Sequence, residues 1–348
     1  MPELRDGSPP ASTPSREGTP ASVWREAGAA FALVFRTPLL IFLVCNLTFV
    51  TTLFALFGAD VQGLAYLHPR QTSLWRMLTA LAPTSWLLTL VILLGDFEQN
   101  LSAWPRTRGT RMTVVLCVLL GLPLHSLPLM AQYIVLKEEP LVAAAIATVL
   151  PTSDVYLKLH ISNMLGLTAT VLIFSGIIGV HTQLIGRLRE LRHHSGATGS
   201  GALDEDVRWY QRQEVLLKRF LTLCAIMLGC SIVSVGALRN LLNQAISTST
   251  ETLPTAPVLG YGIYCTGLLA SVYLPAHNTL KRVDHLLAEQ MLQQSPGAPT
   301  TWKQRYEEQQ AAHAWLGLQG SALQDLQQGL SVLTPLLASI SSLVLGPG

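Results

Sequence analysis

The chain has 348 residues, of which 49% are hydrophobic and only 13% are charged. Soluble domains carry roughly 25% charged residues, so this composition excludes an ordinary soluble enzyme and excludes disorder over most of the chain. The formal net charge of +2 is too close to neutral to indicate a nucleic-acid partner. The composition is typical of an integral membrane protein, whose first partner is the lipid bilayer.

The chain begins with a polar segment and continues with a series of apolar windows. Residues 1–22 are rich in Pro, Ser, Thr and Gly and are predicted to form a disordered tail. A helix needs about 20 apolar residues to cross the hydrocarbon core. Lipid offers no hydrogen-bond partners to the backbone, so a segment of this kind must form a helix, which satisfies its own backbone groups. Six windows lack Asp, Glu, Lys and Arg over that length: 37–59, 77–95, 112–136, 159–186, 220–238 and 252–280. The sequence therefore predicts an all-α fold, a polytopic membrane helix bundle with six transmembrane helices in a domain of residues 23–280.

The distribution of basic residues predicts how these helices are oriented. Fourteen Lys and Arg lie near the span ends that would share one side of the membrane, against five on the other side. Cytosolic flanks carry the excess of Lys and Arg. With six spans, both termini are then expected in the cytosol, in a plasma membrane or a bacterial inner membrane.

Polar side chains within or beside the spans are candidate functional residues, because they are costly in a membrane and often serve a function. His125 lies near the middle of the third span, between two prolines that kink the helix and free backbone carbonyls. A hydrogen bond to a neighbouring helix is the simpler role for His125, and proton gating is the alternative. Asp96 and Glu98 follow the second span on the inner side, where a salt-bridge cluster with the arginines of residues 106–111 is expected.

Three more candidates lie at the outer ends of spans. His160 and Asn163 begin the fourth span, and Arg239 ends the fifth span. A long arginine side chain at this depth is expected to reach the membrane–water interface with its guanidinium group.

The segment between the fourth and fifth spans is predicted to be a cytosolic helical hairpin, residues 185–219. Its first arm is helix-competent, SGATGSGA provides a flexible turn, and LDEDVRWYQRQEVLLKRF leads directly into the fifth span. The acidic residues Asp204, Glu205 and Asp206 suit the N-terminal end of the second arm electrostatically.

The C-terminal region, residues 281–348, is predicted to be helical and cytosolic. An amphipathic extension of the sixth span ends at SPGAP, and two further helices are expected near 301–316 and 320–345. The last of these contains apolar residues spaced alternately by three and four, which is the pattern of a heptad seam. This leucine seam, within residues 323–344, consists of Leu323, Leu326, Leu330, Leu333, Leu337, Ile340 and Val344.

Three arrangements of the leucine seam remain open. It can pack against the chain's own cytosolic helices, associate with a second copy of the chain, or insert as a seventh span, since residues 326–348 are uncharged. The glutamines, the serines and the mid-helix Pro335 weigh against insertion. The positions beside the seam lack the charged pairs of a two-stranded coil. This favours packing in a helical bundle with the chain's own helices, and formation of a homo-oligomer is the second arrangement.

The sequence contains no recognisable catalytic or cofactor-binding signature. A phosphate loop, a G-x-S-x-G turn, H-E-x-x-H and C-x-x-C are absent from the chain, so neither an enzyme nor a cofactor or metal is expected.

The prediction is a signalling or effector membrane protein whose cytosolic helices pack or oligomerise. The alternative is an oligomeric ion channel or pore lined by the kinked third span. A third possibility, an enzyme acting on lipid, would require Asp96, Glu98 and His181 to converge.

Overall fold

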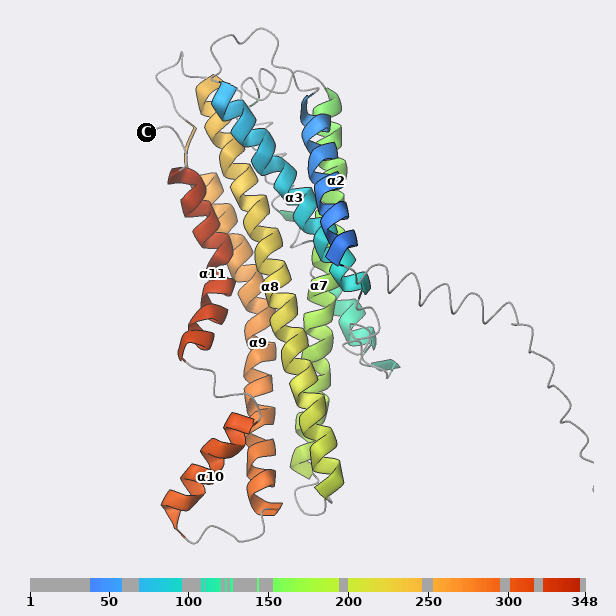
Figure 1. The fold of residues 1–348 in the computed structure, drawn as a ribbon, viewed down its shortest axis with the longest axis vertical. Coiled ribbons are helices and arrows are strands. Elements are labelled where there is room, and N and C mark those ends of the chain that lie inside the picture. The colour runs from blue at the N-terminus through green and yellow to red at the C-terminus, as the bar shows by residue number, and fades with distance from the viewer. Residues whose placement is uncertain are drawn as a thin grey trace, which may run out of the picture.

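The structure is a computed structural model that describes twelve segments of the chain. They are residues 38–57, 69–95, 108–109, 111–119, 123, 126–127, 143, 153–193, 200–245, 253–294, 301–315 and 322–344. These residues are almost entirely helical and include no strand, which confirms the predicted all-α class. Figure 1 shows most of the helices side by side along the long axis of the molecule.

The helices, in chain order, are α2 (Pro38–Phe57), α3 (Pro69–Gly95), α7 (Ser153–His193), α8 (Ser200–Ala245), α9 (Ala256–Gln294), α10 (Trp302–Trp315) and α11 (Ala322–Val344). Within the described residues, four segments are long and apolar enough to cross a membrane: Thr72–Gly95, His160–Arg192, Leu203–Asn243 and Ala256–Gln293. The chain is therefore a helical bundle with the properties of a membrane protein. The apolar helix at Leu40–Leu56 is shorter, and most of the predicted third span, like the predicted tail at 1–22, lies outside the described residues.

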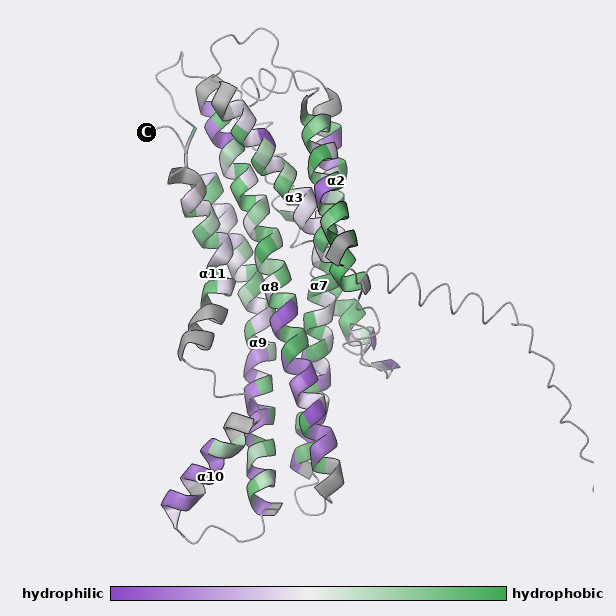
Figure 2. Cartoon of the chain, viewed as in Figure 1, coloured by the Kyte–Doolittle hydropathy of each residue, from purple (hydrophilic) through white to green (hydrophobic). Residues whose placement is uncertain are grey.

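Three helices are much longer than a membrane crossing requires. α7 has 41 residues, α8 has 46 and α9 has 39. At 1.5 Å per residue each is about 60–70 Å long, roughly twice the thickness of the hydrocarbon core. Figure 2 shows apolar residues gathered in one half of these helices and polar residues in the other half. We refer to them as the apolar half and the polar half of the bundle.

The apolar half is held together by close contacts between aromatic rings and glycines. A Cβ atom at Gly176 of α7 would lie 2.6 Å from the ring of Phe220 of α8, so the ring packs directly on the glycine. The ring of Trp86 of α3 packs in the same way on Gly166 of α7. Its indole N–H donates a 3.2 Å hydrogen bond to the Ser231 hydroxyl of α8. Small residues allow such close approach of membrane helices, and these contacts join α3, α7 and α8.

The C-terminal helix α11 packs against α8 and α9, beside their apolar halves, whereas α10 contacts α9 near its polar end (Figures 1 and 2). Val332, Pro335 and Ser339 are buried on the side of α11 that faces the bundle. The described side chains of the leucine seam are 43–47% exposed: Leu330, Leu333, Leu337 and Ile340. The described part of the leucine seam is therefore not the surface that α11 uses for packing within the chain. The side chains of Leu323, Leu326 and Val344 lie outside the described residues.

Candidate functional site

Two adjacent cations on α8 mark the level at which the apolar half of the bundle meets the polar half. The guanidinium of Arg219 donates a 3.3 Å hydrogen bond to the carbonyl of Ile92, in the last turn of α3. Carbonyls at a helix C-terminus lack helical partners and attract cations. Lys218 forms a 2.6 Å ion pair with Glu214, one turn further into the polar half. The charge-free window of α8 begins directly after Arg219.

Beyond this level, α8 buries polar side chains alongside apolar ones such as Leu203, Val207 and Leu217. The spacing of the polar residues by three and four places them on the face of the helix that packs against α7 and α9. Asp206, Tyr210, Gln213 and Glu214 are all less than 9% exposed, and Asp284 of α9 is 3% exposed. We call these five residues, together with Gln183 and Arg187 of α7, the buried polar cluster.

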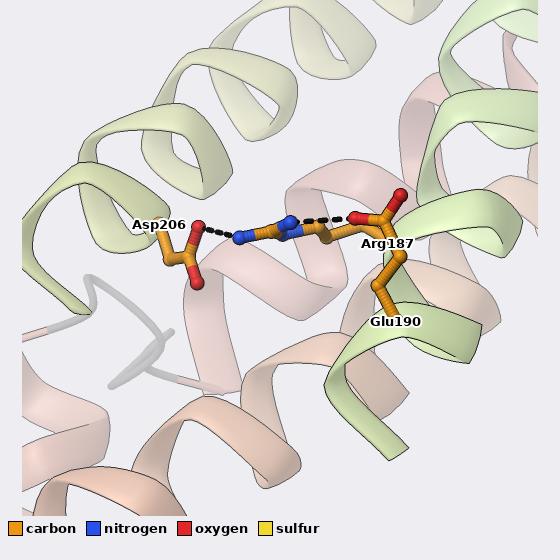
Figure 3. A network of polar contacts seen from close by, with 3 residues as sticks. All are labelled: Arg187, Glu190 and Asp206. Atoms are coloured by element: carbon orange, nitrogen blue, oxygen red, sulfur yellow. Dashed lines mark hydrogen bonds and ion pairs between the residues drawn. The ribbon is translucent and has the colours of Figure 1, made fainter. Parts of the chain in front are cut away.

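The best-defined contact of the buried polar cluster joins α7 to α8 (Figure 3). The Arg187 guanidinium donates from one nitrogen to a carboxylate oxygen of Asp206, and from the other nitrogen to Glu190 at 2.5 Å. Asp206 has only 8% of its side chain exposed, compared with 59% for Glu190. Glu190 is on α7, like Arg187, whereas Asp206 is on α8, so of these two ion pairs only the one with Asp206 links the two helices.

The remaining members of the cluster lie between Arg187 and the level of Arg219. Gln213 donates a 3.4 Å hydrogen bond from its amide nitrogen to the side-chain oxygen of Gln183 on α7. The Tyr210 side chain is fully buried, and its hydroxyl has no hydrogen-bond partner among the described residues. It lies close enough to Asp284 and Glu214 to interact electrostatically with both carboxylates. The phenol of tyrosine is ordinarily protonated near neutral pH, so the Tyr210 side chain adds no charge to the cluster.

Buried polar groups of this kind specify geometry more than they add stability. Each group costs free energy when it leaves water and regains it only with a partner in the correct place. A sliding movement of α7 against α8 would separate Arg187 from Asp206 and Gln183 from Gln213. Within the described residues, no group of three or more His, Cys, Asp or Glu side chains is arranged to hold a metal ion. The cluster is therefore suited to fixing the register of the helices.

Of the six polar residues predicted as candidates from the sequence, three lie within the described residues and three do not. His125, Asp96 and Glu98 lie outside the described residues. His160 is exposed near the beginning of α7, and Asn163 is partly buried one turn later. They are not part of the buried polar cluster, which lies near the other end of α7 (Figure 1).

Arg239 has a defined structural role at the end of α8 opposite to the cluster. Its guanidinium donates hydrogen bonds to the carbonyls of Leu253 at 2.6 Å and Pro254 at 3.0 Å. The backbone N–H of Leu253 in turn donates to the side-chain oxygen of Asn243 at 2.7 Å. These contacts hold the segment before α9 against the end of α8. The sequence predicted only the position of Arg239 at the end of an apolar span, and not this role.

The buried polar cluster was not predicted from the sequence, although a signal was present. Asp206, Tyr210 and Gln213 are spaced by four and three residues, in phase with the apolar stripe formed by Leu203, Leu217 and Phe220. Polar residues in phase with an apolar stripe indicate either that they are buried with the stripe or that the buried face of the helix ends there. Sequence reasoning assigned Asp206 only to the helix terminus, whereas the structure pairs it with Arg187 of another helix.

Comparison of the chain with known protein families, curated proteins and solved structures finds no match.

Proposed function

We propose that this chain is a membrane signalling or effector protein in which α7, α8 and α9 carry a change in the membrane bundle to a cytosolic helical end. The apolar half is the membrane-embedded part, and the polar half with α10 is the cytosolic part. The observation that carries the proposal is the continuity of these three helices, each of which is a single helix through both halves. Their Lys- and Arg-rich end corresponds to the cytosolic side.

Continuity transmits movement if the same two helices stay in contact in both halves, so that a change in their crossing angle in one half also changes their separation in the other. In the apolar half, Phe220 on Gly176 fixes α7 to α8 through close packing. In the polar half, the contact between Arg187 and Asp206 fixes the same two helices through charge. Small shifts at one end of packed helices are carried along rigid elements because packed interfaces deform little. A tilt of the membrane-embedded segments is therefore expected to change the crossing angle of α7 and α8, and with it the distance between their cytosolic ends.

The test uses bilayer thickness to perturb the membrane-embedded part. A hydrophobic stretch that does not match the bilayer adapts by tilting. Spin labels are attached to the full chain at Arg189→Cys of α7 and Arg212→Cys of α8, both exposed in the polar half. Cys224 and Cys265 are buried and stay in place, while Cys45, Cys117 and Cys230 are replaced by alanine. Pulsed electron paramagnetic resonance then measures the distance in bilayers of short and long acyl chains.

The proposal predicts that the distance between the two labels changes by about 1–2 Å or more between the two bilayers, as in helix shifts at other interfaces. A matched pair on a single helix, Arg208→Cys with Ile226→Cys on α8, is expected to keep its distance because both positions are exposed on one continuous helix. An unchanged distance between α7 and α8 would count against transmission. Ion flux through the same vesicles would favour the channel alternative instead.

A further inference from the structure

The helix α11 has the residue distribution of a helix in lipid and not that of a helix in water. Among the described residues, its packed face lacks leucines with a fully buried side chain and includes small polar residues: Thr334 contacts Gly229 of α8, and a Cβ atom at Gly262 of α9 would overlap the Ser339 side chain. The Thr266 hydroxyl of α9 accepts a 3.1 Å hydrogen bond from the backbone N–H of Leu336. Its outward face is the leucine seam, in which the described side chains are 43–47% exposed.

This distribution is opposite to that expected in water. A helix on the surface of a soluble domain turns its leucines inward and its polar residues outward. Membrane helices instead associate through small residues and hydrogen bonds. Lipid tails are as apolar as leucine, so burying a leucine between helices gives no hydrophobic free energy. The contacts of α11 with Gly229, Gly262 and Thr266 are of the second kind.

The depth of these contacts agrees with an embedded helix. Gly229 is at the centre of the charge-free window 220–238, and Thr266 is at the centre of the window 252–280. Asp325 is the sole charged residue in the sequence of α11. Thr334, which contacts Gly229, lies nine residues after Asp325. At 1.5 Å per residue that distance is about 14 Å, close to half of the hydrocarbon thickness. No charged residue follows in 326–348.

The helices beside α11 also expose large apolar side chains. At the same level, Ile226 and Val235 of α8 are 46% and 40% exposed, and Ile263 of α9 is 60% exposed. An exposed apolar surface that extends over several helices of a candidate membrane bundle has the chemistry of the lipid-facing surface.

The direction of α11 follows from its contacts with α9. Leu336 contacts Thr266, and Ser339, three residues later, contacts Gly262, four residues earlier in α9. The two helices are therefore antiparallel, as Figure 1 shows. Since α9 runs from the apolar half towards the polar half, α11 leads away from the end where α10 lies.

We propose that α11 is an additional membrane-embedded helix whose leucine seam contacts lipid acyl chains, and that its C-terminal end reaches the side of the membrane opposite to α10. This inference rests on the membrane placement of the bundle proposed above. It replaces the cytosolic position of this helix that the sequence favoured. The exposed leucine seam is then covered by lipid, and not by a second copy of the chain.

The test measures what surrounds the leucine seam in the full chain in vesicles. A small fluorophore is attached at Leu333→Cys, again with Cys224 and Cys265 retained, and is exposed to nitroxide-labelled lipids or to aqueous iodide. Two controls define the limits: Ile263→Cys on the lipid-facing side of α9, and Lys303→Cys on α10, where the lysine side chain is 74% exposed. The label at residue 333 is expected to follow residue 263, with several-fold weaker quenching by iodide than at residue 303. An epitope added after Gly348 is expected to be accessible only from the side opposite to residue 303.

Each other result overturns the inference in a recognisable way. Iodide quenching at residue 333 equal to that at residue 303 would place α11 in water. Protection from both quenchers, together with disulfide-linked dimers of Leu333→Cys, would make a second copy the occupant of the leucine seam. An epitope on the same side as residue 303 would show that α11 does not cross. Absence of lipid quenching at the Ile263→Cys control as well would overturn the membrane placement of the whole bundle, which separates that failure from a failure at α11 alone.

Discussion

Arg187 shows how one side chain holds two helices together in the polar half. Its partner Asp206 is nearly buried, with one carboxylate oxygen on the guanidinium and the other without a hydrogen-bond partner among the described residues. A buried ion pair gains little over apolar packing, but removing one member leaves an uncompensated buried charge. The cost of a substitution at this site therefore depends on whether the partner keeps its charge.

Arg187→Ala is expected to destabilise the protein by about 1–3 kcal/mol, below the 3–5 kcal/mol of fully buried pairs because the arginine is partly exposed. Asp206→Asn removes the charge that would be stranded, so the double variant is expected to cost less than the sum of the two single variants. The measurement is thermal unfolding of the full chain in detergent. Arg189→Ala, an exposed arginine on the same helix, is the control. Additive losses would mean that Arg187 and Asp206 do not act as a pair.

At the residue scale, the sequence identified positions but not their partners. Arg239 was predicted at the outer end of a span from its place after an apolar window, and the structure adds its two carbonyl acceptors. Those carbonyls lie 14 and 15 residues away across a chain reversal, and no local pattern specifies them. Tyr210 shows the same limit, because its carboxylate neighbour Asp284 is on another helix.

At the scale of elements, α11 shows what an apolar period predicts and what it leaves open. The spacing of three and four predicted a helix near 320–345, and α11 at Ala322–Val344 confirms it. The same spacing occurs in a helix that buries its leucines in a bundle and in one that turns them towards lipid. The distinguishing residues are Thr334 and Ser339 together with Gly229 and Gly262, which are small residues on three different helices. Their proximity depends on the tertiary structure.

The contact of α3 with α7 depends on a glycine that leaves room for an indole ring. A Cβ atom at Gly166 would lie 2.7 Å from the Trp86 ring, which is held in place by its hydrogen bond to Ser231. Gly166→Ala is therefore expected to lower the midpoint of thermal unfolding, because either the ring or the helix has to move.

Gly186→Ala, on the same helix, is the matched control for this prediction. A Cβ atom there has nothing within 4 Å, and alanine is favoured over glycine in a helix by about 1 kcal/mol. This variant is expected to unfold at an equal or higher temperature than the original chain. Equal midpoints for the two variants would contradict the close packing of Trp86 on Gly166.

At the scale of the whole molecule, charge-free windows located apolar segments but not the lengths of the helices that contain them. The windows 159–186 and 220–238 lie within α7 and α8, which continue to His193 and start at Ser200. Residues 185–193 and 200–219 of the predicted hairpin are thus continuous with the apolar segments of α7 and α8. Lys218 and Arg219 bounded the window in the sequence. In the structure Lys218 pairs with Glu214 of the same helix and Arg219 donates to Ile92 of α3, and neither interrupts α8.

Continuity through the level of Arg219 is the property on which transmission depends. Hydrogen–deuterium exchange of the full chain in lipid nanodiscs tests it most directly, since amides exchange where a helix opens locally. Slow exchange is expected without interruption in α8 from Leu203 to Leu242, and in α7 as far as Leu188. Fast exchange over residues 204–217 beside slow exchange over 220–240 would show that the polar half opens independently, and would contradict the coupling of the two halves.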